Sequence, residues 1–315
     1  GSGATAVTIV PEMAKDAAHV TMLQRSPTYI VSLPSEDKIA NWLRRRLPPM
    51  FAYRLVRWRN VLLQMYFFNR ARKYPQKVKS YILKLAQQEL GPDYDVGTHF
   101  NPRYNPWDQR LCLVPDSDLF RMIRENKASV VTDQLEGFTD KGLQLKSGRA
   151  VDADIIVTAT GLQLKVVGGV QLSVDGRAID LARAMTYKGM MFSDVPNLVS
   201  VFGYTNASWT LKCDLTCAYV CRLLNYMSAR RYTMCMPRRD PAVEEAPWLN
   251  LTSGYIRRVE HMLPRQGRKA PWKLYQNYAL DMLTLRFGKV DDGTLAFSAP
   301  AGPAVASPAP LEVAA

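Results

Sequence analysis

The spacing of hydrophobic residues near the start of the chain predicts a helix followed by a strand. Apolar positions recur at helical spacing over residues 4–18, although Pro11 should kink that helix. The predicted apolar face consists of Ala6, Val7, Val10, Met13 and Ala17. Residues 19–24 form a short apolar run of the kind found in buried strands. A helix that leads into such a strand is typical of a βαβ unit.

The next part of the chain has the pattern of helices separated by prolines. Residues 35–92 are helical in pattern, with Ser35 as the predicted N-cap. Pro48-Pro49 and Pro75 should break this stretch, and Gly91-Pro92 should end it. Residues 93–118 are rich in loop-forming residues. We therefore expect a helical segment in several pieces, followed by a long irregular stretch.

Strand patterns return in the middle of the chain. A short helix is predicted over 119–126, and strands are predicted at 129–132, 143–145 and 155–158. The last of these is a continuous apolar run, as in a central parallel strand. Residues 198–203 predict another buried strand, and residues 214–230 predict a helix. The Ala/Pro-rich tail over 299–315 cannot build a core and is expected to be disordered.

Composition describes an ordinary globular protein. The 315 residues are 47% hydrophobic and 22% charged, and this length allows about two domains. No uncharged apolar stretch reaches the roughly 18 residues of a membrane span. The five cysteines lack the spacing of a zinc or redox site, so we expect small, free core residues and no metal. Three of them, Cys213, Cys217 and Cys221, recur every four residues and should share one helix face.

The positive charge is concentrated in one segment. Residues 38–88 contain 13 Lys and Arg and no Asp or Glu, and since the whole chain carries +13, the remainder is neutral overall. Aromatic residues interleave with these cations, as in helices that lie on anionic membranes or bind nucleic acid. A basic face that meets solvent or attracts an anionic cofactor is the plainer interpretation. No nucleic-acid motif accompanies the charge, so we expect no nucleic-acid partner; peripheral membrane contact stays open.

The first six residues carry the most direct chemical information. Gly1-Ser2-Gly3-Ala4-Thr5-Ala6 has the G-x-G-x-x-A form of a dinucleotide-binding loop, whose glycines let a pyrophosphate approach the backbone at a helix N-terminus. Arg25 and Ser26 stand where an acidic residue would bind the ribose of NAD. A cation and a hydroxyl suit the 2′-phosphate of NADP. Because no strand precedes the loop, we expect the chain to be a fragment of a longer protein.

Four ordered motifs resemble one family. They are the glycine-rich loop, Gln24-Arg25-Ser26-Pro27, Asp108-Gln109-Arg110-Leu111-Cys112, and the apolar run that ends in Ala159-Thr160-Gly161. Over roughly residues 1–290 the chain resembles flavin-dependent Baeyer–Villiger and flavin-containing monooxygenases. The stretch over 203–212 is most similar to the ethionamide-activating monooxygenase group.

The resemblance implies an α/β fold with two dinucleotide-binding domains, that is, Rossmann-like lobes with a helical insertion. Residues 1–34 and 107–161 would form the NADP-binding domain, and residues 35–106 the basic helical insertion. Residues 162–298 would be the C-terminal part of the FAD-binding domain. The βαβ unit that binds FAD in this family, with its own glycine-rich loop, is expected to precede residue 1.

The resemblance also implies a reaction. NADPH would reduce FAD, and O2 would form a C4a-peroxyflavin that converts a ketone to an ester or a sulfide to a sulfoxide. Arg110 matches the family's active-site arginine and would stabilise the anionic adduct. Gln109 stands where many relatives have a lysine that contacts the NADP phosphate, which leaves Arg25 and Ser26 as the remaining clamp. The Ala159-Thr160-Gly161 turn would lie near the domain crossover.

Other functions stay open at this point. An N-hydroxylating flavin monooxygenase would use the same two cofactors. A protein that binds NADP or a membrane surface without catalysis is the alternative outside enzymes, and we expect the chain by itself to be inactive. A disulfide-reducing flavoprotein would need a C-x-x-C pair, which the sequence lacks. We expect a cytoplasmic location, with peripheral contact at the inner face of the membrane as a further option.

Overall fold

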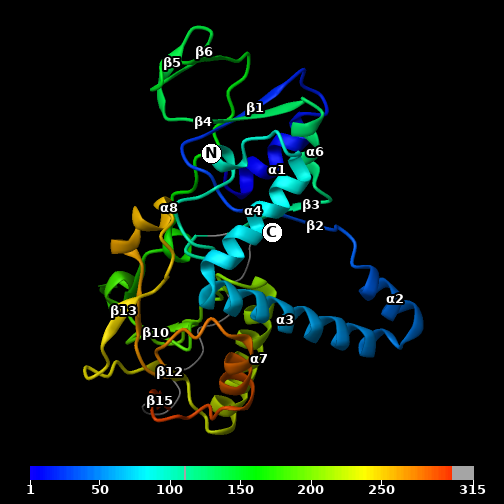
Figure 1. Ribbon diagram of the computed structural model, residues 1–315. Coiled ribbons are helices and arrows are strands. Elements are labelled where there is room, and N and C mark those ends of the chain that lie inside the picture. Colours follow the sequence, from blue (N-terminus) through cyan, green and yellow to red (C-terminus); the bar gives the residue numbers. More distant parts are fainter. Residues whose placement is uncertain (110, 300–315) are drawn as a thin grey trace, which may run out of the picture. The chain divides into compact units, whose positions relative to one another are not determined.

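The computed structural model describes residues 1–109 and 111–299, which fall into two compact units (Figure 1). Unit 1 contains Gly1–Leu164 and Asn250–Val259, and unit 2 contains Lys165–Leu249 and residues 260–299. No pattern in the sequence indicated that residues 250–259 pack with unit 1. Apart from Ala299, the predicted tail lies outside the described residues.

Unit 1 has the α/β architecture that the sequence predicts. Its parallel pairs are β1 (Val20–Gln24) with β4 (Ala128–Thr132), and β2 (Ile30–Leu33) with β3 (Cys112–Pro115). Parallel strands need long crossovers, which the helices supply. An antiparallel meander follows, made of β5 (Leu135–Thr139), β6 (Gly142–Leu145) and β7 (Ala150–Asp152). The strand β3 lies in a stretch expected to be irregular.

One apolar cluster joins the helices of unit 1 to its parallel strands. These helices are α1 (Ala4–Met13), α4 (Pro75–Leu90), α5 (Val96–His99) and α6 (Asp118–Arg124); a further short helix of unit 1, α8 (Gly254–Arg257), lies outside this cluster. Val7 of α1, Leu90 of α4 and Leu119 of α6 meet Met22 and Val114 of the strands in this cluster. The helix predicted over 119–126 and the strands predicted at 19–24, 129–132 and 143–145 are confirmed.

The basic segment forms helices that break at the predicted prolines. They are α2 (Lys38–Arg46), α3 (Pro49–Lys73) and α4, and both α3 and α4 begin with proline at N1, a position that needs no N–H. The long helix α3 buries Ala52, Val61 and Ala71 and leaves most of its larger apolar side chains exposed. Packing of α3 therefore uses mainly Ala52, Val61 and Ala71, and most of its large apolar side chains are exposed.

Two helix boundaries differ from the prediction. Helix α1 ends at Met13 rather than Ala18, and Pro11 lies in its last turn. Helix α2 is capped by Asp37 rather than Ser35: the Asp37 carboxylate accepts the Ala40 N–H at 3.0 Å. The backbone N–H of Ser35 instead donates to Asp116 at 3.0 Å.

Two predicted strands are wrong. Residues 155–158 and 198–203 belong to no ladder among the described residues, and Ile155, Ile156 and Val157 are 75%, 40% and 50% exposed. An apolar run becomes a strand when a neighbouring strand satisfies its backbone groups. In the described part of the chain neither segment has such a neighbour.

Unit 2 combines the long helix α7 (Trp209–Ala229) with short antiparallel pairs. The pairs are β8 (Leu172–Val174) with β9 (Arg177–Ile179), β10 (Thr186–Tyr187) with β11 (Met191–Phe192), β12 (Met234–Pro237) with β15 (Leu295–Ser298), and β13 (Glu245–Pro247) with β14 (Arg265–Gly267). A short helix, α9 (Tyr278–Met282), contacts α7. Helix α7 begins at Trp209 rather than at residue 214.

The cysteines are only partly core residues. Cys112 and Cys235 are buried, as expected, but Cys217 and Cys221 are exposed on α7. Their four-residue spacing places them on one face of the helix, and that face is the outer one. The expectation that all five are small core residues is therefore wrong for this pair.

Candidate functional site

The glycine-rich loop lies at the N-terminus of α1, within unit 1. Gly3 is the N-cap; no side chain caps the helix, and its first turn holds no acidic residue. The N–H groups of a first turn have no partner inside the helix, and the helix dipole adds partial positive charge there. This end of α1 is therefore suited to a phosphate or pyrophosphate.

Ser2 joins this loop to the segment that follows β1. The Ser2 hydroxyl donates to the carbonyl oxygen of Ser26 at 3.0 Å and lies 2.9 Å from the Thr28 hydroxyl. Ser2 is buried, whereas the side chains of Arg25 and Ser26 are exposed. Among the described residues, Arg25 has no acidic partner, so its guanidinium is available beside the loop.

The Ala-Thr-Gly turn lies against the same loop. A Cβ on Gly1 would stand 2.4 Å from the carbonyl oxygen of Ala159, so the two backbones approach as closely as glycine allows. Gly161 has φ +103°, a conformation that favours glycine. Ala159 also packs against the core of unit 1. The structure thus brings the first and last of the predicted cofactor segments together.

Arg110, the predicted catalytic residue, lies outside the described residues. The segment before it is held by several contacts of Asp108. The Asp108 carboxylate pairs with Arg72 of α3 at 2.8 Å and accepts the Asn105 N–H at 3.2 Å. Its carbonyl oxygen accepts from the N–H of Thr252 at 3.0 Å and from the Thr252 hydroxyl at 3.1 Å.

Neighbouring residues support this segment further. Trp107 has φ +71° and packs edge-on against Phe68 of α3, with ring centroids 5.6 Å apart. Half-buried Gln109 forms an isolated β-bridge with Pro106. Sequence reasoning missed the link to α3, because no spacing rule connects Arg72 with Asp108, 36 positions later.

Unit 2 contains a buried charged pair close to the stretch that resembles the family. Lys212 and Asp281 have side chains that are each 7% exposed, and their charged atoms are 3.1 Å apart. The Tyr204 hydroxyl donates to Asp281 at 2.7 Å. Burial lowers the pKa of Lys212, an effect that Asp281 opposes. Burial and the Asp281 charge raise the pKa of Tyr204.

The loop between Tyr204 and α7 is held by Gln276. Its side-chain carbonyl accepts the N–H of Thr205 at 3.0 Å, and its backbone carbonyl accepts from the Asn206 amide at 2.9 Å. The buried Oδ1 of Asn206 has no partner among the described residues. This loop thus offers an unsatisfied acceptor at the start of α7, within the stretch over 203–212 that resembles the ethionamide-activating monooxygenase group.

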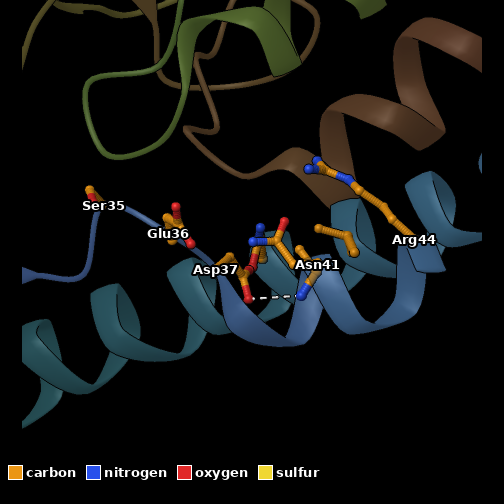
Figure 2. Close-up of a pocket in the computed structure, with 8 residues that line it drawn as sticks. Ser35, Glu36, Asp37, Asn41 and Arg44 are labelled. Carbon is orange, nitrogen blue, oxygen red and sulfur yellow. Dashed lines mark hydrogen bonds between the residues drawn. The ribbon is translucent and has the colours of Figure 1, made fainter.

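A separate pocket of about 410 Å³ opens between the start of α2 and α3 (Figure 2). Its lining residues are Ser35, Glu36, Asp37, Ala40, Asn41, Arg44, Val56 and Asn60. Ser35, Glu36 and Asp37 lie at one end and Arg44 at the other (Figure 2). None of the predicted site residues lines this pocket. Because Glu36 and Asp37 line it together with Arg44, this pocket does not have the uniformly positive lining of an anion site.

Known proteins resemble the chain over nearly its whole length. It is 53% identical over 300 residues to the FAD-containing monooxygenase EthA of Mycobacterium tuberculosis. That alignment covers 95% of this chain and 61% of EthA. The probable FAD-binding monooxygenase AlmA of Acinetobacter baylyi is 49% identical over 94% of the chain, and the putative FAD-containing monooxygenase MymA of M. tuberculosis 48% over 96%. The chain is homologous to these FAD-containing monooxygenases. It spans about three fifths of the length of these relatives (61%, 60% and 62%). No family model matches the chain.

Solved structures of monooxygenases share the fold of this chain. OTEMO in complex with FAD and NADP superposes with a TM-score of 0.62 at 14% identity, over 95% of this chain and 66% of that one. Oxidized steroid monooxygenase bound to NADP superposes with a TM-score of 0.65 at 16% identity, over 95% of this chain and 66% of that one. The polycyclic ketone monooxygenase of Thermothelomyces thermophila also gives 0.65, covering 58% of that chain. The predicted fold class is confirmed.

Proposed function

We propose that this chain is part of an NADPH- and O2-dependent FAD monooxygenase and supplies its NADP site. The observation that carries the proposal is the convergence of three segments at the N-terminus of α1: the loop from Gly1 to Thr5, Ser26 after β1, and Ala159. The names of the relatives, FAD-containing monooxygenases, support the same reaction class.

The residues of unit 1 fit NADP as follows. The loop from Gly1 to Thr5 (Gly1, Ser2, Gly3, Ala4 and Thr5) would hold the pyrophosphate, with the unpaired N–H groups of the first turn of α1 as donors. Arg25, exposed and without an acidic partner among the described residues, and the Ser26 hydroxyl bind the 2′-phosphate. The remaining residues that we propose to contact NADP are Gln109, Ala159, Thr160 and Gly161. For the domains we propose the division inferred from the sequence: NADP-binding 1–34 and 107–161, insertion 35–106, and FAD-binding 162–298, of which residues 250–259 pack with unit 1.

For FAD, the chain contributes only a part of the site. The sequence holds a single glycine-rich dinucleotide loop, and we assign it to NADP. In unit 2, the buried, unsatisfied Oδ1 of Asn206 beside the uncapped start of α7 is the feature that fits a hydrogen-bonding ligand such as a flavin. When bound, FAD supplies the transfer of electrons from NADPH to O2.

Arg110 is the proposed catalytic residue. Its guanidinium stays charged at any working pH and would stabilise negative charge that develops on the reacting oxygen. The substrate would be a ketone, converted to an ester, or a sulfide, converted to a sulfoxide. Asp108 is a positioning residue, because its contacts with Arg72 and Thr252 hold the backbone immediately before Arg110.

We also propose peripheral contact between residues 38–88 and a membrane surface. This segment carries the net charge of the chain, and many of its aromatic side chains are exposed. Among the described residues, no helix is both long and apolar enough to cross a bilayer.

The NADP assignment is tested by titrating NADPH and NADH into the Arg25→Ala variant. A hydrogen bond to a charged group contributes about 1.5–3 kcal/mol, so NADPH should bind roughly 10–100-fold more weakly while NADH affinity stays unchanged. Arg103→Ala, an exposed arginine of the same unit, is the matched control. Equal losses for NADPH and NADH, or a loss in the control alone, would contradict the assignment.

A further inference from the structure

Helix α2 and the first half of α3 form a hairpin that extends from the α/β core of unit 1 (Figure 1). Its base is fixed by Asp37, which caps α2 and pairs with Arg59 of α3 at 2.6 Å. Beyond that base, α2 buries only Ala40, and none of its residues belongs to the core cluster of unit 1. The hairpin therefore has a defined root and a largely solvent-exposed tip.

One face of α3 carries an apolar stripe that is exposed to a large extent. Phe51, Leu55, Trp58, Leu62 and Tyr66 recur at helical spacing and are 53%, 40%, 39%, 59% and 56% exposed. At the tip, Trp42 and Met50 are 54% and 63% exposed. Contiguous exposed apolar surface of this kind marks an interaction site, whereas isolated exposed side chains do not.

The same hairpin is strongly cationic. Arg44, Arg45 and Arg46 end α2 and Arg54 lies in the second turn of α3; all four are exposed and none has an acidic partner among the described residues. The Arg46 guanidinium stands 5.4 Å from the centre of the Trp42 ring. No Asp or Glu occurs from residue 38 to residue 88. The apolar stripe is thus flanked by uncompensated positive charge.

We propose that this hairpin docks the protein on the surface of an anionic phospholipid bilayer, with its tip and the α3 stripe in the interface. An anionic bilayer offers an apolar layer for Phe51 and Leu62 and phosphates for Arg44–Arg46. A second copy of the chain presents the same positive charge, so pairing of two hairpins through this face is opposed by repulsion. This inference specifies the membrane contact proposed above and does not depend on the NADP site.

The test is sedimentation of the protein with vesicles of phosphatidylcholine alone or with phosphatidylglycerol added. The wild-type protein should bind the mixed vesicles, bind phosphatidylcholine weakly, and lose affinity as salt is raised. The variant R44Q/R45Q/R46Q should bind about a hundredfold more weakly, since each arginine near the surface contributes about fivefold. The control K73Q/K77Q/K84Q removes the same charge outside the tip and should retain most of the binding.

A second pair of variants tests the apolar stripe. Phe51→Ser with Leu62→Ser should weaken vesicle binding at least tenfold, and brominated lipid should quench tryptophan fluorescence in the wild type but less in this variant. Equal binding to both kinds of vesicle, or a control that loses as much as R44Q/R45Q/R46Q, would overturn the proposal. So would a concentration-dependent dimer that the stripe variant abolishes while vesicle binding is unchanged. NADPH titration of each variant reports separately on the NADP site and on folding of unit 1.

Discussion

The buried pair of Lys212 and Asp281 makes a sharp prediction about unit 2. Both side chains are 7% exposed and lie 3.1 Å apart, and Asp281 also accepts the Tyr204 hydroxyl at 2.7 Å. Asp281→Asn preserves the shape of the side chain but removes its charge. Lys212 then remains buried without a counter-ion, in a place where burial already lowers its pKa.

The expected cost follows from the chemistry of buried ion pairs. Breaking such a pair by removing one charge destabilises proteins by about 3–5 kcal/mol. This is a large share of the free energy of unfolding, which is typically about 5–15 kcal/mol. Replacing the whole group by apolar residues is often neutral. We therefore expect Asp281→Asn to lower the free energy of unfolding by about 3 kcal/mol or more. The triple variant Lys212→Met, Asp281→Leu, Tyr204→Phe should have a free energy of unfolding within about 2 kcal/mol of the wild type.

The measurement is urea unfolding of both variants, followed by circular dichroism. Glu244→Gln is the matched control, because Glu244 pairs with Arg268 in the same unit with both side chains more than half exposed, and its loss should be barely measurable. The reasoning fails if Asp281→Asn costs no more than the control. It also fails if the triple variant is as unstable as the single one, because packing rather than charge would then explain the loss.

Three further outcomes are expected. In a protein that turns over a ketone or sulfide, Arg110→Ala should abolish oxygenation with NADPH affinity nearly unchanged, and Asp108→Ala should lower kcat more than it raises KM; unchanged turnover in Arg110→Ala would refute its assignment. His99, whose Nδ1 lies 2.8 Å from the Thr132 hydroxyl, has a pKa that burial lowers. Its neutral form is favoured in the folded state, so the unfolding free energy should be fully present above pH 6.5 and fall below it by at most about 1.4 kcal/mol per pH unit. His99→Gln should flatten that slope, and identical slopes would exclude His99 as the cause.

Local signals predicted much of unit 1. Prolines mark the starts of α3 and α4, because proline at N1 is compatible with a helix but not with its interior. The strand at residues 20–24 was correctly found from its apolar run. These features depend on neighbouring residues, so a sequence shows them directly.

The errors arose where burial or pairing depends on distant segments. Residues 155–158 have the composition of a central strand, yet no strand among the described residues pairs with them. Helical spacing put Cys217 and Cys221 on one face of α7, but the packing of unit 2 left that face exposed. In the same way, the Asp37 carboxylate that caps α2 also binds Arg59, 22 positions later, a contact that a local comparison with Ser35 does not reveal.

For the candidate site, the sequence showed the residue types, and the tertiary structure showed which of them lie together. The residue types of the glycine-rich loop, of Arg25 and Ser26, and of the Ala159 turn carry their chemistry in the sequence, because glycine and arginine have properties that no other residue reproduces. Their convergence at the N-terminus of α1, the anchoring of Asp108 by Arg72 and Thr252, and the exposure of the α3 stripe came from tertiary structure alone. These contacts join positions far apart in the chain, and local periodicity carries no information about which distant backbone will approach.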